Sequence, residues 1–281
     1  MDMSRFQSDL KYVNQIGATL NIEEKMKLEL ALLKLSETEN FDQVLFWGKV
    51  YGLKMDYYVI FGINFRGKYD FPTKKFYWAK SDTYEFNELP EPNLQFQYEV
   101  ESIRTQFTGN HKQELIPAQN NDDNNYQNED EIRIKNKSFT ELDRLSYLVY
   151  TIENDCALYP VGALKITPTH ELRQNQSFKG ITLNQLTDQS KYQHFRSPQS
   201  EEKQNFIARD DALFQFDFLD PISEDQPKGC WSLQLDQLKT AVTLRSLVWQ
   251  GFVGYHRANS QIFGYCYIGY GIKNVDLPFL L

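Results

Sequence analysis

The chain has 281 residues, a length that allows a buried hydrophobic core without disulfide bonds or metal ions. Its formal net charge is −8, and Lys and Arg form no cluster that could neutralise a row of phosphates, which excludes nucleic acid and anionic membranes as expected partners. No apolar run is long enough to span a bilayer and residues 1–10 lack the features of a signal peptide, so we expect a protein that is synthesised in the cytoplasm and not secreted.

Two N-terminal helical segments are predicted between residues 6 and 34, with a break at Gly17. The second segment begins at Asn21, an acceptable N-cap, and Glu24 three residues later completes the pattern of a capping box. Its apolar residues form a broad stripe, which predicts that this helix is a buried layer: Ile22, Met26, Leu28, Leu30, Leu32, Leu33 and Leu35.

Residues 44–65, VLFWGKVYGLKMDYYVIFGINF, crowd aromatic and β-branched residues around glycines. Such residues favour strands, and Gly52 to Lys54 suit a short hairpin loop. Both faces of each strand are mostly apolar, so we expect this hairpin to be central in its sheet or covered on both sides. Residues 74–81, KKFYWAKS, predict a third strand.

Residues 85–105 predict a loop and then a helix, and residues 118–131, AQNNDDNNYQNEDE, offer almost nothing to bury. We therefore expect a mobile Asn/Asp-rich loop at about 118–131. A further helix follows, for which Ser138 is the predicted N-cap with Glu141 completing a capping box. Its apolar stripe consists of Leu142, Leu145, Leu148, Val149 and Ile152.

The last third of the chain carries the clearest strand pattern. In WSLQLD, Trp231, Leu233 and Leu235 alternate with polar residues, as in a half-solvated antiparallel strand. AVTLRSLVW, FVGYH and IFGYCYIG predict further strands. The whole pattern predicts one α+β domain, residues 1–281, in which N-terminal helices and a central helix pack on a mainly antiparallel sheet.

No motif for phosphate, dinucleotide or metal binding is complete. A calcium loop that began at Asp122 would place Gln127 where glycine is required. The histidines show no metal-ligand spacing: His111, His170, His194 and His256. The cysteines are odd in number and far apart, which predicts reduced, partly buried thiols: Cys156, Cys230 and Cys266. We therefore expect no cofactor and no metal, although a nucleophilic pair of Cys156 with a histidine stays open.

Aromatic residues within the predicted strands fit packing in a core or an interface better than stacking on a ligand. The tail KNVDLPFLL is also notable, because four of its last five residues are apolar at a chain end, where fraying is usual. Either its own sheet or a partner protein has to hold this tail.

Five blocks carry a resemblance to a known family: FDQVLFWGKVYGLKMDYYVIFG, LYPVGALKITPT, FLDPISEDQPKGCWSLQ, LRSLVWQGFVGYHRA and FGYCYIGYGIKNVDLPFLL. In this order and at these separations, from near residue 20 to the C-terminus, they resemble the axonemal radial spoke head family. The sequence departs from the family at residues 64–81, in the Asn/Asp-rich tract and at residues 196–217.

The resemblance implies a non-enzymatic structural subunit of the radial spoke head in the axoneme of cilia and flagella. Such subunits help assemble the head and transmit signals from the central pair to the dynein arms, which regulate ciliary beating. The implied partners are the related radial spoke head proteins 4 and 6, MORN-repeat head proteins, the spoke stalk and, transiently, projections of the central pair. The acidic balance would then belong to a head surface that meets the central pair.

The partner surface is expected at aromatic residues of the strands and at the C-terminal tail: Trp47, Tyr57, Tyr58, Trp231, Trp249, Tyr255, Phe263, Asn274, Asp276, Leu277, Pro278 and Phe279. A second hypothesis is a cytosolic α+β enzyme or small-molecule-binding domain with an aromatic-lined pocket. A third is an adaptor protein outside cilia.

Overall fold

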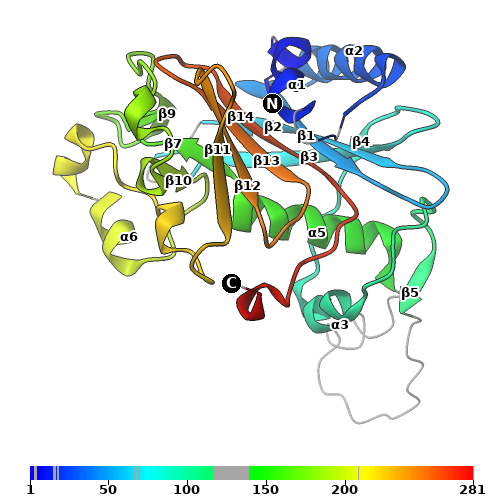
Figure 1. Ribbon diagram of the computed structural model, residues 1–281. Helices are drawn as coiled ribbons and strands as arrows, with labels where there is room; N and C mark the ends of the chain where they lie inside the picture. The colour runs from blue at the N-terminus through cyan, green and yellow to red at the C-terminus, as the bar shows by residue number, and fades with distance from the viewer. Residues whose placement is uncertain are drawn as a thin grey trace.

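A computed structural model describes the chain except for residues 3–4, 15–16, 18, 66, 69, 117–138, 208 and 281. A large sheet runs through the middle, with two N-terminal helices on one face and a long helix on the other (Figure 1). The predicted α+β class with a mainly antiparallel sheet is confirmed. The Asn/Asp-rich tract at 118–131 lies outside the described residues.

The sheet has eight strands in the order β11-β12-β13-β14-β1-β2-β3-β4. Their bounds are β1 Gln43–Val50, β2 Tyr57–Asn64, β3 Thr73–Lys80, β4 Asn87–Glu88, β11 Trp231–Leu235, β12 Ala241–Ser246, β13 Phe252–Arg257 and β14 Phe263–Gly269. Neighbours pair antiparallel except β1 and β14, which run parallel with Gly48 opposite Tyr267. This pair joins the N-terminal and C-terminal strands into one sheet.

Helices α1 (Phe6–Asn14) and α2 (Ile22–Thr38) cover one face of the sheet (Figure 1). The capping box of Asn21 and Glu24 is confirmed. The expectation of a wholly buried apolar stripe is wrong: Leu28, Leu32 and Leu35 are buried, whereas Ile22, Met26, Leu30 and Leu33 are exposed. At about 100° per residue the two sets lie on different sides of the helix, and only one side can face the sheet.

Helix α5 (Glu141–Cys156) lies on the opposite face of the sheet, and Leu145, Leu148, Val149 and Ile152 are buried there, as predicted. Its cap differs from the prediction, which placed it at Ser138 and Glu141. Thr140 is the N-cap and Asp143 completes the capping box, while Ser138 lies outside the described residues. The carboxylate of Glu141 is instead used in a tertiary contact, because it accepts a hydrogen bond from the Tyr57 hydroxyl at 2.7 Å.

Shorter elements surround this framework. The remaining helices and strands are α3 Gln97–Ser102, β5 Glu114–Ile116, β6 Phe139–Thr140, β7 Leu158–Pro160, β8 Leu164–Ile166, β9 Leu172–Gln174, β10 Tyr192–His194 and α6 Glu201–Ile207. Single 3₁₀ turns span Leu94–Phe96, Leu183–Gln185, Gln189–Lys191, Asp210–Phe214, Ile222–Glu224 and Leu277–Phe279.

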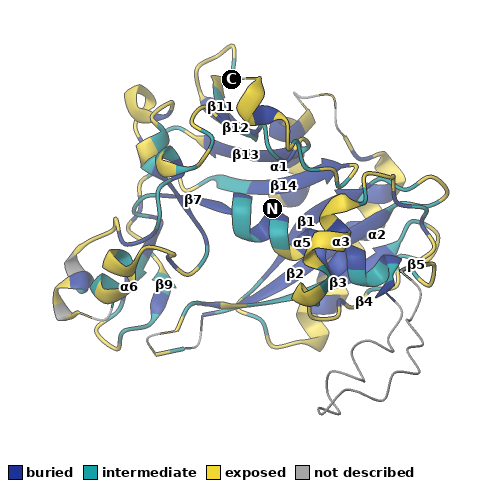
Figure 2. Cartoon of the chain, turned by 90° about the horizontal axis from the view of Figure 1, so that it is seen from below, coloured by how far each residue is buried: buried dark blue, intermediate teal, exposed yellow. Residues whose placement is uncertain are grey.

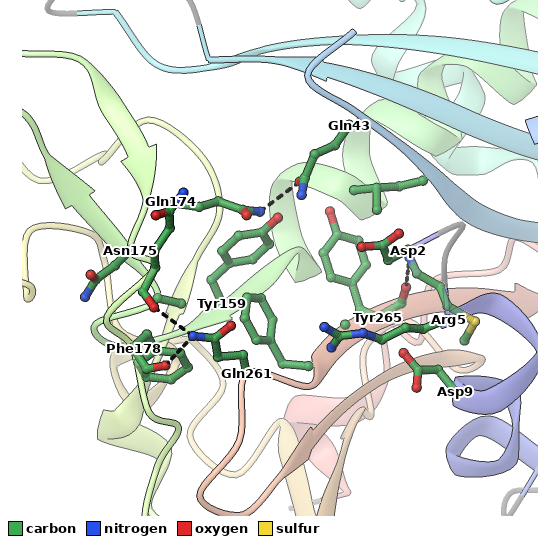
Figure 3. Close-up of a pocket in the computed structure, with 16 residues that line it drawn as sticks. Asp2, Arg5, Asp9, Gln43, Tyr159, Gln174, Asn175, Phe178, Gln261 and Tyr265 are labelled. Carbon is green, nitrogen blue, oxygen red and sulfur yellow. Dashed lines mark hydrogen bonds between the residues drawn. The ribbon is translucent and has the colours of Figure 1, made fainter. Parts of the chain in front are cut away.

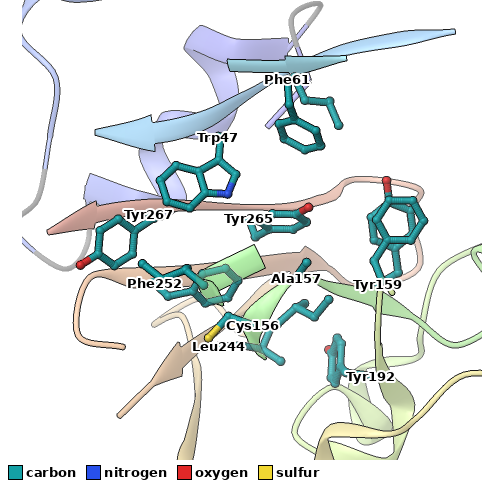
Figure 4. Packing of buried hydrophobic residues seen from close by; sticks show 14 of the residues in the cluster. Trp47, Phe61, Cys156, Ala157, Tyr159, Tyr192, Leu244, Phe252, Tyr265 and Tyr267 are labelled. Carbon is teal, nitrogen blue, oxygen red and sulfur yellow. The ribbon is translucent and has the colours of Figure 1, made fainter. Parts of the chain in front are cut away.

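Both faces of the hairpin formed by β1 and β2 are buried, as predicted. Along β2, Val59 and Phe61 point into the cluster beneath α5, whereas Tyr58 and Ile60 point into the cluster beneath α1 and α2. Figure 4 shows part of the first cluster, in which the side chains of strands far apart in sequence interleave. Each aromatic ring buried in this way removes a large apolar area from water.

Gly48 permits the parallel pairing of β1 with β14. A Cβ atom at this position would overlap the backbone oxygen of Tyr267, and backbone atoms in the middle of a sheet have no room to retreat. A Cβ atom at Gly254 in β13 would instead lie 3.1 Å from Cδ1 of Leu158, the end of a flexible side chain.

The first prediction compares these two glycines. We expect Gly48→Ala to lower the free energy of unfolding by about 1–3 kcal/mol, because the backbone of β1 or β14 must move. Gly254→Ala should cost less than about 1 kcal/mol, since a side chain can adjust. Urea unfolding followed by circular dichroism measures both, and equal losses would contradict the proposed role of Gly48.

The second prediction concerns His256, which is fully buried in β13 and whose Nε2 accepts the N–H of Ile181 at 3.1 Å. Burial lowers the pKa of His256 to about 4, so the unfolded chain binds a proton there more readily than the folded chain. This contribution to stability is complete above the unfolded pKa of about 6.5 and is lost as the pH falls toward 4.

We therefore expect the free energy of unfolding to fall by about 2 kcal/mol from this residue between pH 7.5 and pH 5. Urea unfolding at both pH values measures the change. In His256→Gln, which keeps an acceptor but does not titrate, the dependence on pH in this window should shrink by that amount. If the free energy of unfolding of this variant depends on pH as that of the wild type does, a group other than His256 causes the dependence.

Candidate functional site

The buried cysteines are poor candidates for a nucleophile. Cys156, Cys230 and Cys266 are free and buried. Burial raises the pKa of the Cys230 thiol to about 11 and the pKa of the Cys266 thiol to about 12, and it holds the pKa of Cys156 well above its usual range. At neutral pH these groups are therefore thiols, whereas nucleophilic catalysis requires a thiolate.

Cys156 and His194 line the same hollow, which has a volume of about 260 Å³. This is the Cys–His combination that the structure offers for the nucleophilic pair that the sequence leaves open. The His194 Nε2 lies 2.9 Å from the Asp225 carboxylate, which also accepts the indole N–H of Trp231 at 2.7 Å. Burial, however, holds the pKa of the Cys156 thiol well above its usual range. The imidazole in this hollow is therefore oriented, but the sulfur is not activated as a nucleophile.

No group of three or more His, Cys, Asp or Glu side chains that could hold a metal ion occurs among the described residues. Within the same part of the chain, no helix combines the length and the apolar character that crossing a bilayer requires.

The pocket in Figure 3 lies between the N-terminal segment and residues 159–178, and its volume is about 190 Å³. This is below the roughly 300–1,000 Å³ typical of small-molecule sites. Several polar groups in it already pair with each other: Gln261 donates to the Phe178 carbonyl at 2.9 Å, and Gln174 donates to Gln43 at 2.9 Å. Four of the 16 residues that line it are aromatic, namely Tyr159, Phe178, Phe263 and Tyr265.

Most aromatic residues predicted for a partner surface lie inside the chain. Trp47, Tyr57, Tyr58 and Tyr255 are at most 1% exposed, and Trp231 and Trp249 are also buried. Rings buried to this extent leave little or no surface for another protein, so we do not include them in the partner surface that we propose. Phe263 is half-buried against the Tyr159 ring at 4.9 Å.

The polar tips of several buried rings explain their position, because they donate to carboxylates on helices. Trp47 donates to Glu153 at 3.0 Å, Tyr58 to Glu24 at 2.6 Å, Tyr255 to Asp9 at 2.9 Å and Trp249 to Asp155 at 2.9 Å. These hydrogen bonds attach α1, α2 and α5 to the sheet. The rings are structural, and the carboxylates partly account for the acidic composition.

The predicted tail residues are divided between core and surface. Leu277 is buried, Asn274 is half-buried and donates its backbone N–H to the Val248 carbonyl at 2.8 Å, and Asp276, Pro278 and Phe279 are exposed. Contacts with the loop between β12 and β13 and with the core therefore hold the tail in place. Its outer side nevertheless remains apolar, because Phe279 is 87% exposed and Leu280 is 71% exposed. The chain next to the C-terminus is coloured as exposed in Figure 2.

We name the C-terminal patch after its exposed apolar residues, Tyr270, Ile272, Val275, Phe279 and Leu280. Of these residues only Phe279 was predicted by name for the partner surface, although Val275 and Leu280 belong to the tail that the sequence singles out. A detectable signal was present, because residues 270–280 contain six large apolar residues without the alternation of a strand or the stripe of a helix.

The base of the patch is ordered by tertiary contacts. The Lys273 ammonium lies 3.6 Å from the Asp155 carboxylate and 5.5 Å from the centre of the Trp249 ring. Val275 and Ile272 also line a small cavity of about 130 Å³ together with residues of α3. The C-terminal patch is thus an apolar surface on a fixed support, as protein interfaces require.

Comparison with known proteins gives a consistent relationship. The family model described as "Radial spokehead-like protein" matches residues 1–151. The chain is 32% identical over 283 positions to a zebrafish (Danio rerio) protein named "Radial spoke head protein 9 homolog", covering all of this chain and 99% of the relative. Proteins of the same name from cattle (Bos taurus) and human (Homo sapiens) are each 30% identical, with both chains fully covered. The chain belongs to the radial spokehead-like protein family.

Proposed function

We propose that the protein is a non-enzymatic structural subunit of the radial spoke head in the axoneme of cilia or flagella. Family membership supports a place in the spoke head. The observation that carries the structural role is the C-terminal patch, a fixed apolar surface that a partner protein could cover. The raised thiol pKa values and the small pocket give the alternative enzyme or small-molecule-binding function little support.

The proposed partners at this patch are the other spoke head subunits, namely radial spoke head proteins 4 and 6 and the MORN-repeat head proteins, with the spoke stalk as a further neighbour. A few side chains near the centre of an interface, often aromatic ones, supply most of its binding energy. Phe279 is the best candidate for this role, because it projects from a turn that the buried Leu277 anchors.

The third prediction tests the patch with the variant Phe279→Asp/Leu280→Asp. Both side chains are exposed, so the fold should keep its melting temperature, while incorporation into the spoke head should fall at least tenfold because charge is placed in an apolar contact. The measurement is the amount of tagged protein that co-purifies with spoke head subunits from salt-extracted axonemes.

The matched control is Leu238→Asp, which changes a leucine that is 81% exposed in the turn between β11 and β12. This variant should be incorporated as the wild type is. Normal incorporation of the tail variant would contradict the assignment of the patch. Recovery of the wild-type protein only in the soluble fraction would contradict the spoke head function itself and favour an adaptor outside cilia.

We also propose that the subunit helps transmit signals from the central pair to the dynein arms, with its net negative charge contributing to transient contacts with central pair projections. Exposed acidic residues away from α2, such as Glu201 and Glu202 at the start of α6, are suitable for a test (Figure 1).

The fourth prediction is that Glu201→Lys/Glu202→Lys changes the ciliary waveform or beat frequency without reducing spoke head assembly, because the contact with the central pair depends on charge. High-speed video of beating cilia measures the effect, and Glu201→Gln/Glu202→Gln should give a smaller change. Beating that is identical in all three strains would count against a charge-dependent contact at α6.

A further inference from the structure

Four large apolar side chains form a row on the outer side of α2, which we call the α2 ridge: Ile22, Met26, Leu30 and Leu33. Their exposed fractions are 76, 59, 65 and 43%. The sheet-facing side of α2 is already complete with Leu28, Leu32 and Leu35. A helix at the edge of a protein normally carries polar residues on its outer side. The exposed apolar residues of the ridge therefore indicate a surface that binds another protein.

The spacing of the ridge fits helix packing. Its residues follow at intervals of four, four and three, which places them on one strip of the helix, about 16 Å long at 1.5 Å per residue. Intervals of three and four are those of the seam between two packed helices. Figure 1 shows α2 on the outside of the molecule, where a second helix can reach it.

The ridge is also complementary to itself. If two copies of α2 cross antiparallel about a two-fold axis near residue 28, Ile22 faces Leu33 of the second copy and Met26 faces Leu30 of the second copy. The same axis brings Glu23 close to Lys34 of the second copy, and this pair occurs twice. Lys34 has no ion-pair partner among the described residues, and Glu23 has only an exposed pair with Lys27 at 2.6 Å.

We propose that two copies of this chain associate through antiparallel packing of their α2 ridges. A second copy is favoured over an unrelated helix because both the apolar pairs and the ion pairs match when the helix meets itself. Four side chains on each copy bury less than the roughly 1,200 Å² of a standard interface, so the dimer is weak and forms at micromolar or higher concentration. This inference rests on α2 alone and not on the proposed function.

The fifth prediction is tested with the purified full chain by sedimentation equilibrium over a hundredfold range up to about 300 µM. We expect a reversible monomer–dimer equilibrium, and Met26→Asp/Leu30→Asp should raise the dissociation constant at least tenfold with an unchanged melting temperature. Leu238→Asp serves as the control and should dimerise normally. A monomer throughout the range, or a dimer that the ridge variant does not weaken, would overturn the proposal.

Orientation is tested by oxidative cross-linking. Met26→Cys/Leu30→Cys should form a disulfide-linked dimer much faster than either single variant, because these positions face each other only in the antiparallel arrangement. The native thiols do not compete, since all three are buried.

Exchange of charge gives a second check of the arrangement. Glu23→Lys and Lys34→Glu should each weaken the dimer, and the double variant should restore it. Faster cross-linking of the single variants, or no restoration, would contradict this register.

Discussion

The structure depends on hydrogen bonds between buried aromatic side chains of the sheet and buried carboxylates of the helices that cover it. Burying a tyrosine hydroxyl or an indole N–H without an acceptor is costly, and burying a carboxylate without donors costs more. In this protein the buried ring donors and the buried carboxylates satisfy each other by hydrogen bonding. Glu153 of α5 accepts from Trp47 of β1 and from Tyr265 of β14 at 2.6 Å, and it also pairs with Lys74 of β3 at 2.7 Å. One side chain thus connects α5 to three strands.

The same arrangement recurs on the other face of the sheet. Glu24 of α2 accepts from Tyr58 and pairs with Lys49 at 2.7 Å, and Asp9 of α1 accepts from Tyr255. Such pairs fix the position of each helix because a buried charge that loses its partner is strongly destabilising. The abundance of aromatic residues therefore serves the assembly of the chain itself. We propose that partner proteins use apolar surface that the core leaves exposed, at the C-terminal patch and on the α2 ridge. In Figure 1 these surfaces lie on opposite sides of the sheet, which would let one subunit contact two neighbours at once.

Local patterns predicted much of this architecture. The capping box at Asn21, the hairpin of residues 44–65 and the strand from Trp231 to Leu235 each depend on neighbours in sequence. Burial along this strand does not alternate as predicted, since Leu235 is exposed. The contacts that were predicted wrongly are long-range. The carboxylate of Glu141 resembles part of a capping box but binds Tyr57, 84 residues away. The parallel pairing that Gly48 permits joins positions more than 200 residues apart, and no local pattern specifies it. Burial of Trp47 or Tyr255 likewise depends on helices whose positions the sequence does not show.

Cross-linking mass spectrometry of isolated axonemes tests most directly whether partner proteins contact the two apolar outer surfaces. An amine-reactive reagent should link Lys273, beside the C-terminal patch, to other radial spoke head subunits. Lys25, Lys27 and Lys34 of α2 should link to the same helix of a second copy. If these lysines form links only within their own chain while lysines elsewhere on the surface link to the spoke head subunits, both surfaces are assigned wrongly. If the protein forms no links to the spoke head, its proposed place in that assembly is contradicted.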